Sequence, residues 1–236
     1  MRKKNMWIAA ALMMAAASMM PCKAQQVTAL PLSMDDVALA LKVLGVQTTR
    51  FDLTPFKNEK YNVSIYIDEY EKGNPERIKR NYANFGENLL DIRNYQEEEW
   101  DEARKLYDIP QDEYIGVRIK DVVFAIYHAK GDSVATLKFN VNFAGGSTRP
   151  LKLHELEGKK DSYSYHSRPF ALKPVTDSDY AEIPLWLYGS AWKDHNFFRF
   201  CGENEIDPNL KETNSTLLTH CPHYYIIGVA LEKVKK

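Results

Sequence analysis

A run of strict alternation over residues 134–143 constrains this chain more than any other stretch. Its odd positions are apolar and the even positions between them are polar, namely Ala135, Leu137, Phe139, Val141 and Phe143 against Thr136, Lys138, Asn140 and Asn142. A period of two is typical of a β-strand that buries one face and exposes the other. The run therefore predicts a sheet with one face in water.

The stretch before this run carries the same signal with a change of phase. Apolar residues occupy odd positions over residues 115–119 and even positions over residues 122–126. A β-bulge at Lys120–Asp121 would keep both halves facing the core, and we predict one there. Residues 130–132, which include Gly131, then join the two strands as a short hairpin connection.

Other segments rich in apolar and aromatic residues are further strand candidates. The clearest is residues 61–70, where Tyr61, Val63, Ile65 and Ile67 share one face. Weaker candidates are residues 150–156, 163–172, 183–188, 196–201 and 224–234. The last contains a run that is apolar on both faces, residues 225–231, so we expect a central strand covered on each side.

Two short helices are expected beside these strands. Residues 33–36 have the S-x-x-D spacing of a capping box, followed by an apolar stripe at Met34, Val37, Leu41 and Leu44 that should lie on the domain. A second helix is predicted over residues 97–107, capped by Asn94 and Glu97. Many short strands and few helices predict a mainly β fold, an antiparallel, jelly-roll-like β-sandwich with two short peripheral helices.

Residues 1–24 differ from the rest of the chain. Arg2, Lys3 and Lys4 precede an apolar run over residues 6–20, and Cys22 and Ala24 fit the small positions of a cleavage site. This predicts a signal peptide over residues 1–24 and a mature chain of residues 25–236, a single β-rich domain with one lobe or two. The mature protein would have no transmembrane segment and would be periplasmic or on the cell surface.

Two alternatives remain for this N-terminal segment. It could be retained as an anchor, although the apolar run is short for a membrane span. Cys22 could instead be lipidated after cleavage, but Met19 and Pro21 stand where lipoprotein signals usually carry a leucine and a small residue. Cleavage without lipidation is therefore favoured.

Charge and composition exclude several classes of protein. The chain has 31 basic and 32 acidic side chains, with 44% apolar residues, which is unlike disordered, collagen-like or polytopic membrane proteins. A formal charge of -1 provides no basic field for phosphate backbones, so we expect no nucleic-acid partner. Removal of residues 1–24 takes away only basic charge and leaves a mildly acidic protein.

Cys201 and Cys221 are the thiols that remain after cleavage. Because an exported protein meets an oxidising milieu, we predict a disulfide between them. The alternatives are a nucleophilic cysteine with His195, His220 or His223 as base, and a zinc site built on His220, Cys221 and His223 and closed by Cys201 or His195. The nucleophile lacks a third group to orient it, and the zinc site lacks a known motif spacing, so no catalytic residue, metal or other cofactor is predicted.

Other motifs are incomplete. His154 and Glu155 begin like the zinc motif H-E-x-x-H, but Gly158 takes the place of the second histidine. Asp177, Ser178, Asp179 and Glu182 offer oxygen ligands without the glycine and spacing of a calcium loop. The first segment is therefore excluded as a zinc protease motif, and the second is interpreted as a solvated acidic turn.

Aromatic side chains are frequent in the C-terminal half, and they suggest the candidate ligand site. Exposed aromatic rings can stack on sugar rings, and Trp192 with His195, in the loop after residue 188, are the candidates for this role. For Trp192 a place in the core is an equally good interpretation. Trp186 lies within an apolar strand and is assigned to the core.

Three segments together resemble a known family. They are residues 61–70, the acidic helix that ends in Ile109–Pro110, and the hairpin around Gly131–Asp132–Ser133. The pattern resembles an uncharacterised family of exported proteins of gut Bacteroidetes, catalogued as a domain of unknown function. The resemblance implies an envelope location and no catalytic residues. It also makes Ser133 a candidate O-glycosylation site, because Asp132–Ser133–Val134 looks like the acceptor used in those bacteria.

The sequence thus favours an exported, non-enzymatic protein that binds a glycan, a peptide or an envelope protein. A carbohydrate-active hydrolase is the alternative, since its paired carboxylates need to be close in space and not in sequence. A purely structural envelope component is the third hypothesis.

Overall fold

A computed structural model describes residues 37, 40, 41, 43–74, 76–173, 179–210 and 214–235. The chain divides into two compact units, Met1–Val37 and Ala38–Lys236, and the elements below all belong to the second. The predicted signal peptide, the first helical cap at residues 33–36, and Asp177 and Ser178 of the acidic turn lie outside the described residues. Val37, Ala40, Leu41 and Val43 are helical, but Leu44 at the end of the predicted stripe is 65% exposed.

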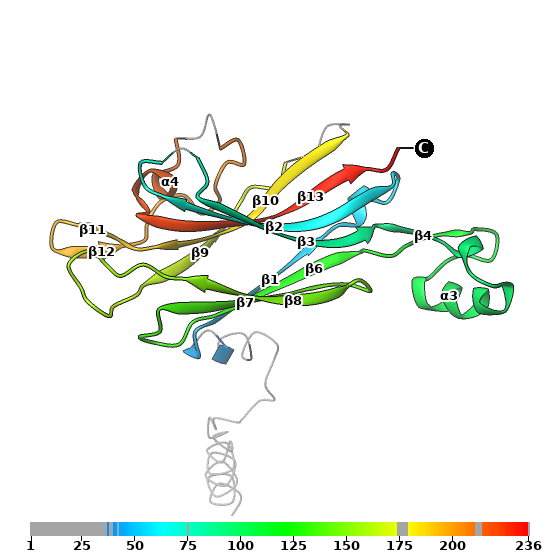
Figure 1. The fold of residues 1–236 in the computed structure, drawn as a ribbon, viewed down its shortest axis with the longest axis horizontal. Coiled ribbons are helices and arrows are strands. Elements are labelled where there is room, and N and C mark those ends of the chain that lie inside the picture. Colours follow the sequence, from blue (N-terminus) through cyan, green and yellow to red (C-terminus); the bar gives the residue numbers. More distant parts are fainter. Residues whose placement is uncertain are drawn as a thin grey trace, which may run out of the picture. The chain divides into compact units, whose positions relative to one another are not determined.

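Strands make up most of the second unit (Figure 1). They are β1 (Val46–Asp52), β2 (Tyr61–Glu71), β3 (Lys79–Glu87), β4 (Leu89–Asp91), β5 (Ile115–Val117), β6 (Asp121–Tyr127), β7 (Val134–Val141), β8 (Gly145–Lys152), β9 (Tyr165–Pro169), β10 (Tyr180–Ser190), β11 (Trp192–Asp194), β12 (Phe197–Arg199) and β13 (His223–Lys233). The helices are α3 (Trp100–Tyr107) and α4 (Thr216–His220), with short 3-10 turns η1 (Thr54–Phe56), η2 (Ile92–Asn94) and η3 (Glu97–Glu99).

Two antiparallel sheets form the body of the unit. One has the strand order β1-β6-β7-β8, and the other has the order β3-β2-β13-β10-β9. Figure 1 shows them as two layers, and one hydrophobic core contains buried side chains from both. We call the side of the five-stranded sheet that contributes to this core its inner face. The predicted mainly β, antiparallel fold is confirmed.

The alternation of apolar and polar residues along the strands explains which side chains enter the core. Side chains of β7 alternate between exposed and buried along its whole length, and Leu137 and Phe139 are fully buried. Strand β13 instead buries nine consecutive residues, because it is the middle strand and a second cluster with Leu187, Ile226 and Leu217 covers its other side. Its predicted central position is confirmed, as is the core position of Trp186.

The hairpin of β6 and β7 is confirmed, but its predicted surroundings need two corrections. The bulge at Lys120–Asp121 is wrong, because β5 pairs with β4 while β6 begins at Asp121 and pairs with β1 and β7. The change of phase marks the passage from one sheet to another. At the other end β7 stops at Val141, and Phe143 lies in the turn to β8, where it is 43% exposed.

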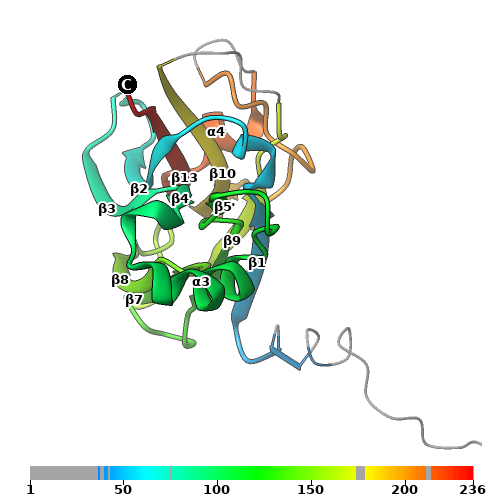
Figure 2. The same ribbon diagram turned by 90° about the vertical axis from the view of Figure 1, so that its right-hand side faces the viewer.

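The second predicted helix is present with a different cap. Its first turn is η3 and its remainder is α3, which lies beside β4 and β5 in Figure 2. The predicted cap at Asn94 and Glu97 is wrong, because Gln96 and Glu99 form the capping box. Asn94 instead ends the separate turn η2. Within the described residues, no helix has both the length and the apolar character to cross a membrane.

Candidate functional site

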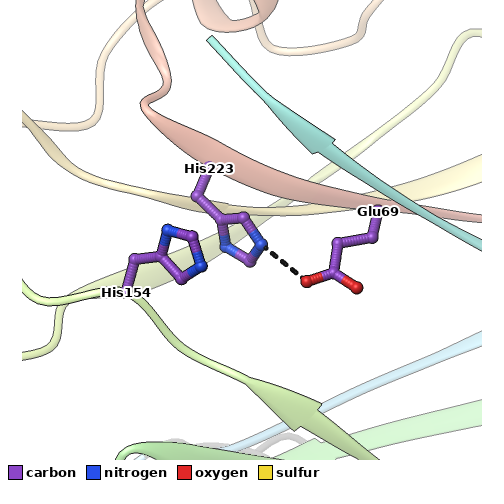
Figure 3. A group of neighbouring side chains, drawn as sticks. All are labelled: Glu69, His154 and His223. Carbon is purple, nitrogen blue, oxygen red and sulfur yellow. Dashed lines mark hydrogen bonds and ion pairs between the residues drawn. The ribbon is translucent and has the colours of Figure 1, made fainter. Parts of the chain in front are cut away.

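Three ligand-type side chains from distant parts of the chain meet at one end of the inner face (Figure 3). Glu69 is on β2, His223 begins β13, and His154 follows the end of β8. Glu69 lies directly opposite Tyr225 in the register of β2 and β13, so the alternation that directs Ile65 and Ile67 inward also directs Glu69 inward. We call Glu69, His154 and His223 the inner cluster.

Hydrogen bonds hold both nitrogens of the His223 ring. Nε2 lies 3.2 Å from Oε1 of Glu69, and Nδ1 lies 2.6 Å from the hydroxyl of Tyr165. The Tyr165 oxygen also accepts a hydrogen bond from the backbone N–H of His154, at 2.9 Å. The Tyr225 hydroxyl lies 3.2 Å from the same Glu69 oxygen. The imidazole is therefore fixed in position by side chains from two other strands, β2 and β9.

The His154 ring stacks on the His223 ring. Their centroids are 3.9 Å apart and the planes differ by 11°. His223 is fully buried, whereas the His154 side chain is 46% exposed and has Glu71 at 3.8 Å from its Nδ1. One histidine is thus held rigidly within the protein and the other faces water.

Burial controls the charge of this site. It lowers the pKa of His223, and the neighbouring His154 acts in the same direction, while the hydrogen bond to Glu69 opposes both. Burial also raises the pKa of Tyr165 and of Tyr225, so both hydroxyls stay protonated. At neutral pH Glu69 consequently faces neutral partners, a histidine and a tyrosine. A neutral imidazole beside a carboxylate can transfer a proton or coordinate a metal ion.

A second group of charged side chains lies on the opposite face of β2, and its carboxylates differ from Glu69 in having a basic partner. Asp68 is 2% exposed and forms an ion pair with Arg80 of β3, which also pairs with Glu182 of β10. The Arg80 guanidinium lies 4.8 Å from the centre of the Tyr66 ring. We call Asp68, Arg80 and Glu182 the outer cluster. Its two carboxylates share one cation and are not a free acid and base pair.

A cavity opens between the sheets at the other end of the inner face. It has a volume of about 560 Å³, and its walls come from β1, η1, β2, β10 and β13. The apolar residues that line it are Phe51, Leu53, Pro55, Phe56, Tyr61, Leu172, Ile183, Leu185 and Val229. The charged side chains at its edge are Asp52, Glu59 and Lys173.

The predicted ligand site at Trp192 and His195 does not form. Trp192 is 8% exposed and stacks on His220 with the ring centres 5.5 Å apart, so its ring is part of the second core cluster. His195 stands at the turn between β11 and β12, where its side chain is 91% exposed and bonded to Asp194. The two side chains therefore offer no shared surface for a ligand.

The predicted disulfide is not formed either. Cys201 and Cys221 are both free thiols, the first exposed and the second buried. Cys221 packs among apolar side chains of the second core cluster, and burial raises the pKa of its thiol to about 12. Such a thiol is a poor nucleophile at neutral pH. Ser133 lies exposed in the loop between β6 and β7, and its glycosylation stays a prediction.

Sequence inspection considered His154 and His223 separately and missed Glu69. In the sequence His154 belongs to an incomplete motif, and His223 lies close to His220, which packs on Trp192 in the structure. Glu69 carried a usable signal, because it continues the inward-facing positions 61, 63, 65 and 67 of an apolar strand face. A carboxylate in such a position requires a buried partner. Its partner is 154 residues away, beyond any local motif.

The comparisons with known proteins add a family and no activity. No curated protein and no solved structure matches the chain significantly. A family model described as a domain of unknown function, DUF5041, matches residues 16–233, as the resemblance to such a domain implied. The chain therefore belongs to the DUF5041 family.

Proposed function

We propose that this chain is an exported, non-enzymatic binding protein of the cell envelope, and that apolar side chains of a peptide or partner protein enter its cavity. The cavity carries the proposal. Its volume of about 560 Å³ falls within the range of roughly 300–1,000 Å³ that is usual for ligand pockets. The charged leader-like segment over residues 1–24 supports export, and the family of exported Bacteroidetes proteins that it resembles supports an envelope location.

The lining of the cavity favours an apolar ligand over a sugar. Sugars need several hydrogen-bonding groups inside the site, whereas the walls here are mainly aromatic and aliphatic. The charges at the edge already have partners: Glu59 pairs with Lys233, and Lys173 pairs with Asp207. Burial of apolar surface would therefore provide most of the binding free energy.

Calorimetric titration of hydrophobic peptides and of oligosaccharides tests this proposal. Ile183→Trp fills part of the cavity from β10, and Val134→Trp on the partly exposed start of β7 is the matched control. We expect hydrophobic peptides to bind, Ile183→Trp to abolish binding, and Val134→Trp to leave it unchanged. Binding of oligosaccharides alone, or equal binding by both variants, would contradict the assignment. N-terminal sequencing of native protein tests export separately and should begin at Gln25.

A further inference from the structure

The inner cluster has the donor atoms of a transition-metal site, and this inference is independent of the cavity. One carboxylate oxygen and two imidazole nitrogens, from Glu69, His154 and His223, lie within 4.8 Å of one another (Figure 3). We propose that these three side chains bind a divalent transition-metal ion, and that Zn²⁺ is the ion that fits them best. No other set of three such side chains converges in this way within the described part of the chain.

The donor types select the ion. Imidazole nitrogen suits zinc and its neighbours in the first transition row, whereas calcium and magnesium prefer oxygen ligands alone. Two histidines and one carboxylate are a known zinc ligand set, in which a water molecule or another ligand takes the fourth position. The site would therefore be open to a further ligand on the side where His154 faces water.

The geometry requires one modest movement. Zinc bonds to nitrogen and oxygen are about 2.0–2.2 Å long, so ligand atoms around a tetrahedral ion are about 3.4 Å apart. The atoms of the inner cluster must approach by about 1.4 Å from their present limit of 4.8 Å. His154 can make this movement because its side chain is half exposed and its ring is held only by the stack on His223 and by Glu71, 3.8 Å from its Nδ1.

Groups around the cluster already hold His223 as a ligand. In the metal-free protein the hydrogen bond to Glu69 at 3.2 Å places the ring proton on Nε2. When a cation takes the Nε2 lone pair, the neutral ring can carry its proton on Nδ1 instead and donate it to the Tyr165 oxygen at 2.6 Å. Histidines that bind metals are usually oriented in this way, through a hydrogen bond from the second ring nitrogen. Tyr165 also binds the backbone N–H of His154, so one hydroxyl positions both histidines.

The charge of the cluster favours a cation. No lysine or arginine among the described residues lies within 4.0 Å of the Glu69 carboxylate, which contacts His223 and Tyr225. The adjacent Asp68, by contrast, is neutralised by Arg80. A bound divalent ion would supply the positive charge that the protein does not place beside Glu69.

Titration of the full-length, chelator-treated protein with Zn²⁺ alone tests the proposal, using material without a polyhistidine tag. Calorimetry should show one ion bound per chain, and Co²⁺ should give the visible absorption of a nitrogen and oxygen site. His154→Ala should weaken Zn²⁺ binding by at least about 100-fold, and Tyr165→Phe by about 10–100-fold, as expected for a ligand and for the group that orients one. Glu69→Gln provides a second ligand variant that preserves side-chain volume.

Two control variants remove exposed metal-binding groups elsewhere. His195→Ala and Cys201→Ser should bind Zn²⁺ as the wild type does, since neither residue belongs to the inner cluster. Circular dichroism without metal establishes that each variant is folded. Absence of Zn²⁺ binding by the wild type would overturn the proposal and leave a purely structural hydrogen-bond network. Equal affinity of His154→Ala, Glu69→Gln and wild type would overturn it as well.

Discussion

Asp68 and Glu69 are neighbours on β2, and the pleat of the strand directs them to opposite faces of one sheet. Asp68 joins the outer cluster, where Arg80 gives it a permanent positive partner. Glu69 joins the inner cluster, where His223 and Tyr225 give it hydrogen bonds and no fixed charge. Burial of a carboxylate therefore does not define its role. A carboxylate with its cation already in place stabilises the fold, and one with neutral partners can still receive a cation.

The largest difference between the clusters should appear in stability. Arg80→Met leaves the buried Asp68 with only the more distant Arg77, 3.8 Å away, and such a change should lower the free energy of unfolding by about 3–5 kcal/mol. Glu69→Gln keeps the size of the side chain and an oxygen acceptor, so it should cost only about 1 kcal/mol. Urea denaturation followed by circular dichroism measures both. Similar losses for the two variants would remove the proposed distinction.

Tyr165→Phe should lower the free energy of unfolding by an intermediate amount. The lost hydroxyl leaves His223 Nδ1 and the His154 N–H without a partner, which should cost about 1–3 kcal/mol. Tyr82→Phe, on the exposed side of β3, removes a hydroxyl that bonds to the Arg80 side chain and is the matched control. We expect a smaller loss there, since water can replace the bond. If urea denaturation gave equal losses in the free energy of unfolding for the two variants, the hydrogen bonds of the Tyr165 hydroxyl would contribute no more to stability than those of an exposed one.

The smallest effect that we expect is on how the free energy of unfolding changes with pH in acid. Hydrogen bonds from Arg80 lower the pKa of Glu182 in the folded protein, against a smaller effect of burial. The stabilisation is complete above the ordinary pKa of 4.5 and is lost as the pH falls through the lowered value. Glu182→Gln should therefore flatten the fall of stability below about pH 4.5. An unchanged slope in denaturation at several acidic pH values would contradict the assigned ion pair.

The fold was largely accessible from the sequence because alternation is a local signal. It located β2, β7 and β13, and it identified β13 as central from its apolar character on both faces. The alternation gave a wrong prediction where the chain passes from one sheet to another. A bulged strand and the end of a strand give the same shift of phase in the sequence near Lys120. Only the pairing of β5 with β4 and of β6 with β1 shows that one strand ends there and another begins.

The candidate site was much less accessible. Its members come from β2, the segment after β8 and the start of β13, and only the register of β2 with β13 places Glu69 beside His223. The sequence search favoured Trp192 and the cysteines because their residue types are conspicuous. The structure gives Trp192 and Cys221 to the second core cluster, where apolar packing accounts for both.

X-ray diffraction from crystals of the protein grown with Zn²⁺, with data on both sides of the zinc absorption edge, tests whether the inner cluster binds zinc. We expect an anomalous peak bonded at about 2.0–2.2 Å to Glu69, His154 and His223, with the His154 ring turned out of its stack. We expect none beside Asp68, where Arg80 occupies the position of the cation. A zinc peak elsewhere, with His223 still bonded to Glu69, would contradict the proposed site.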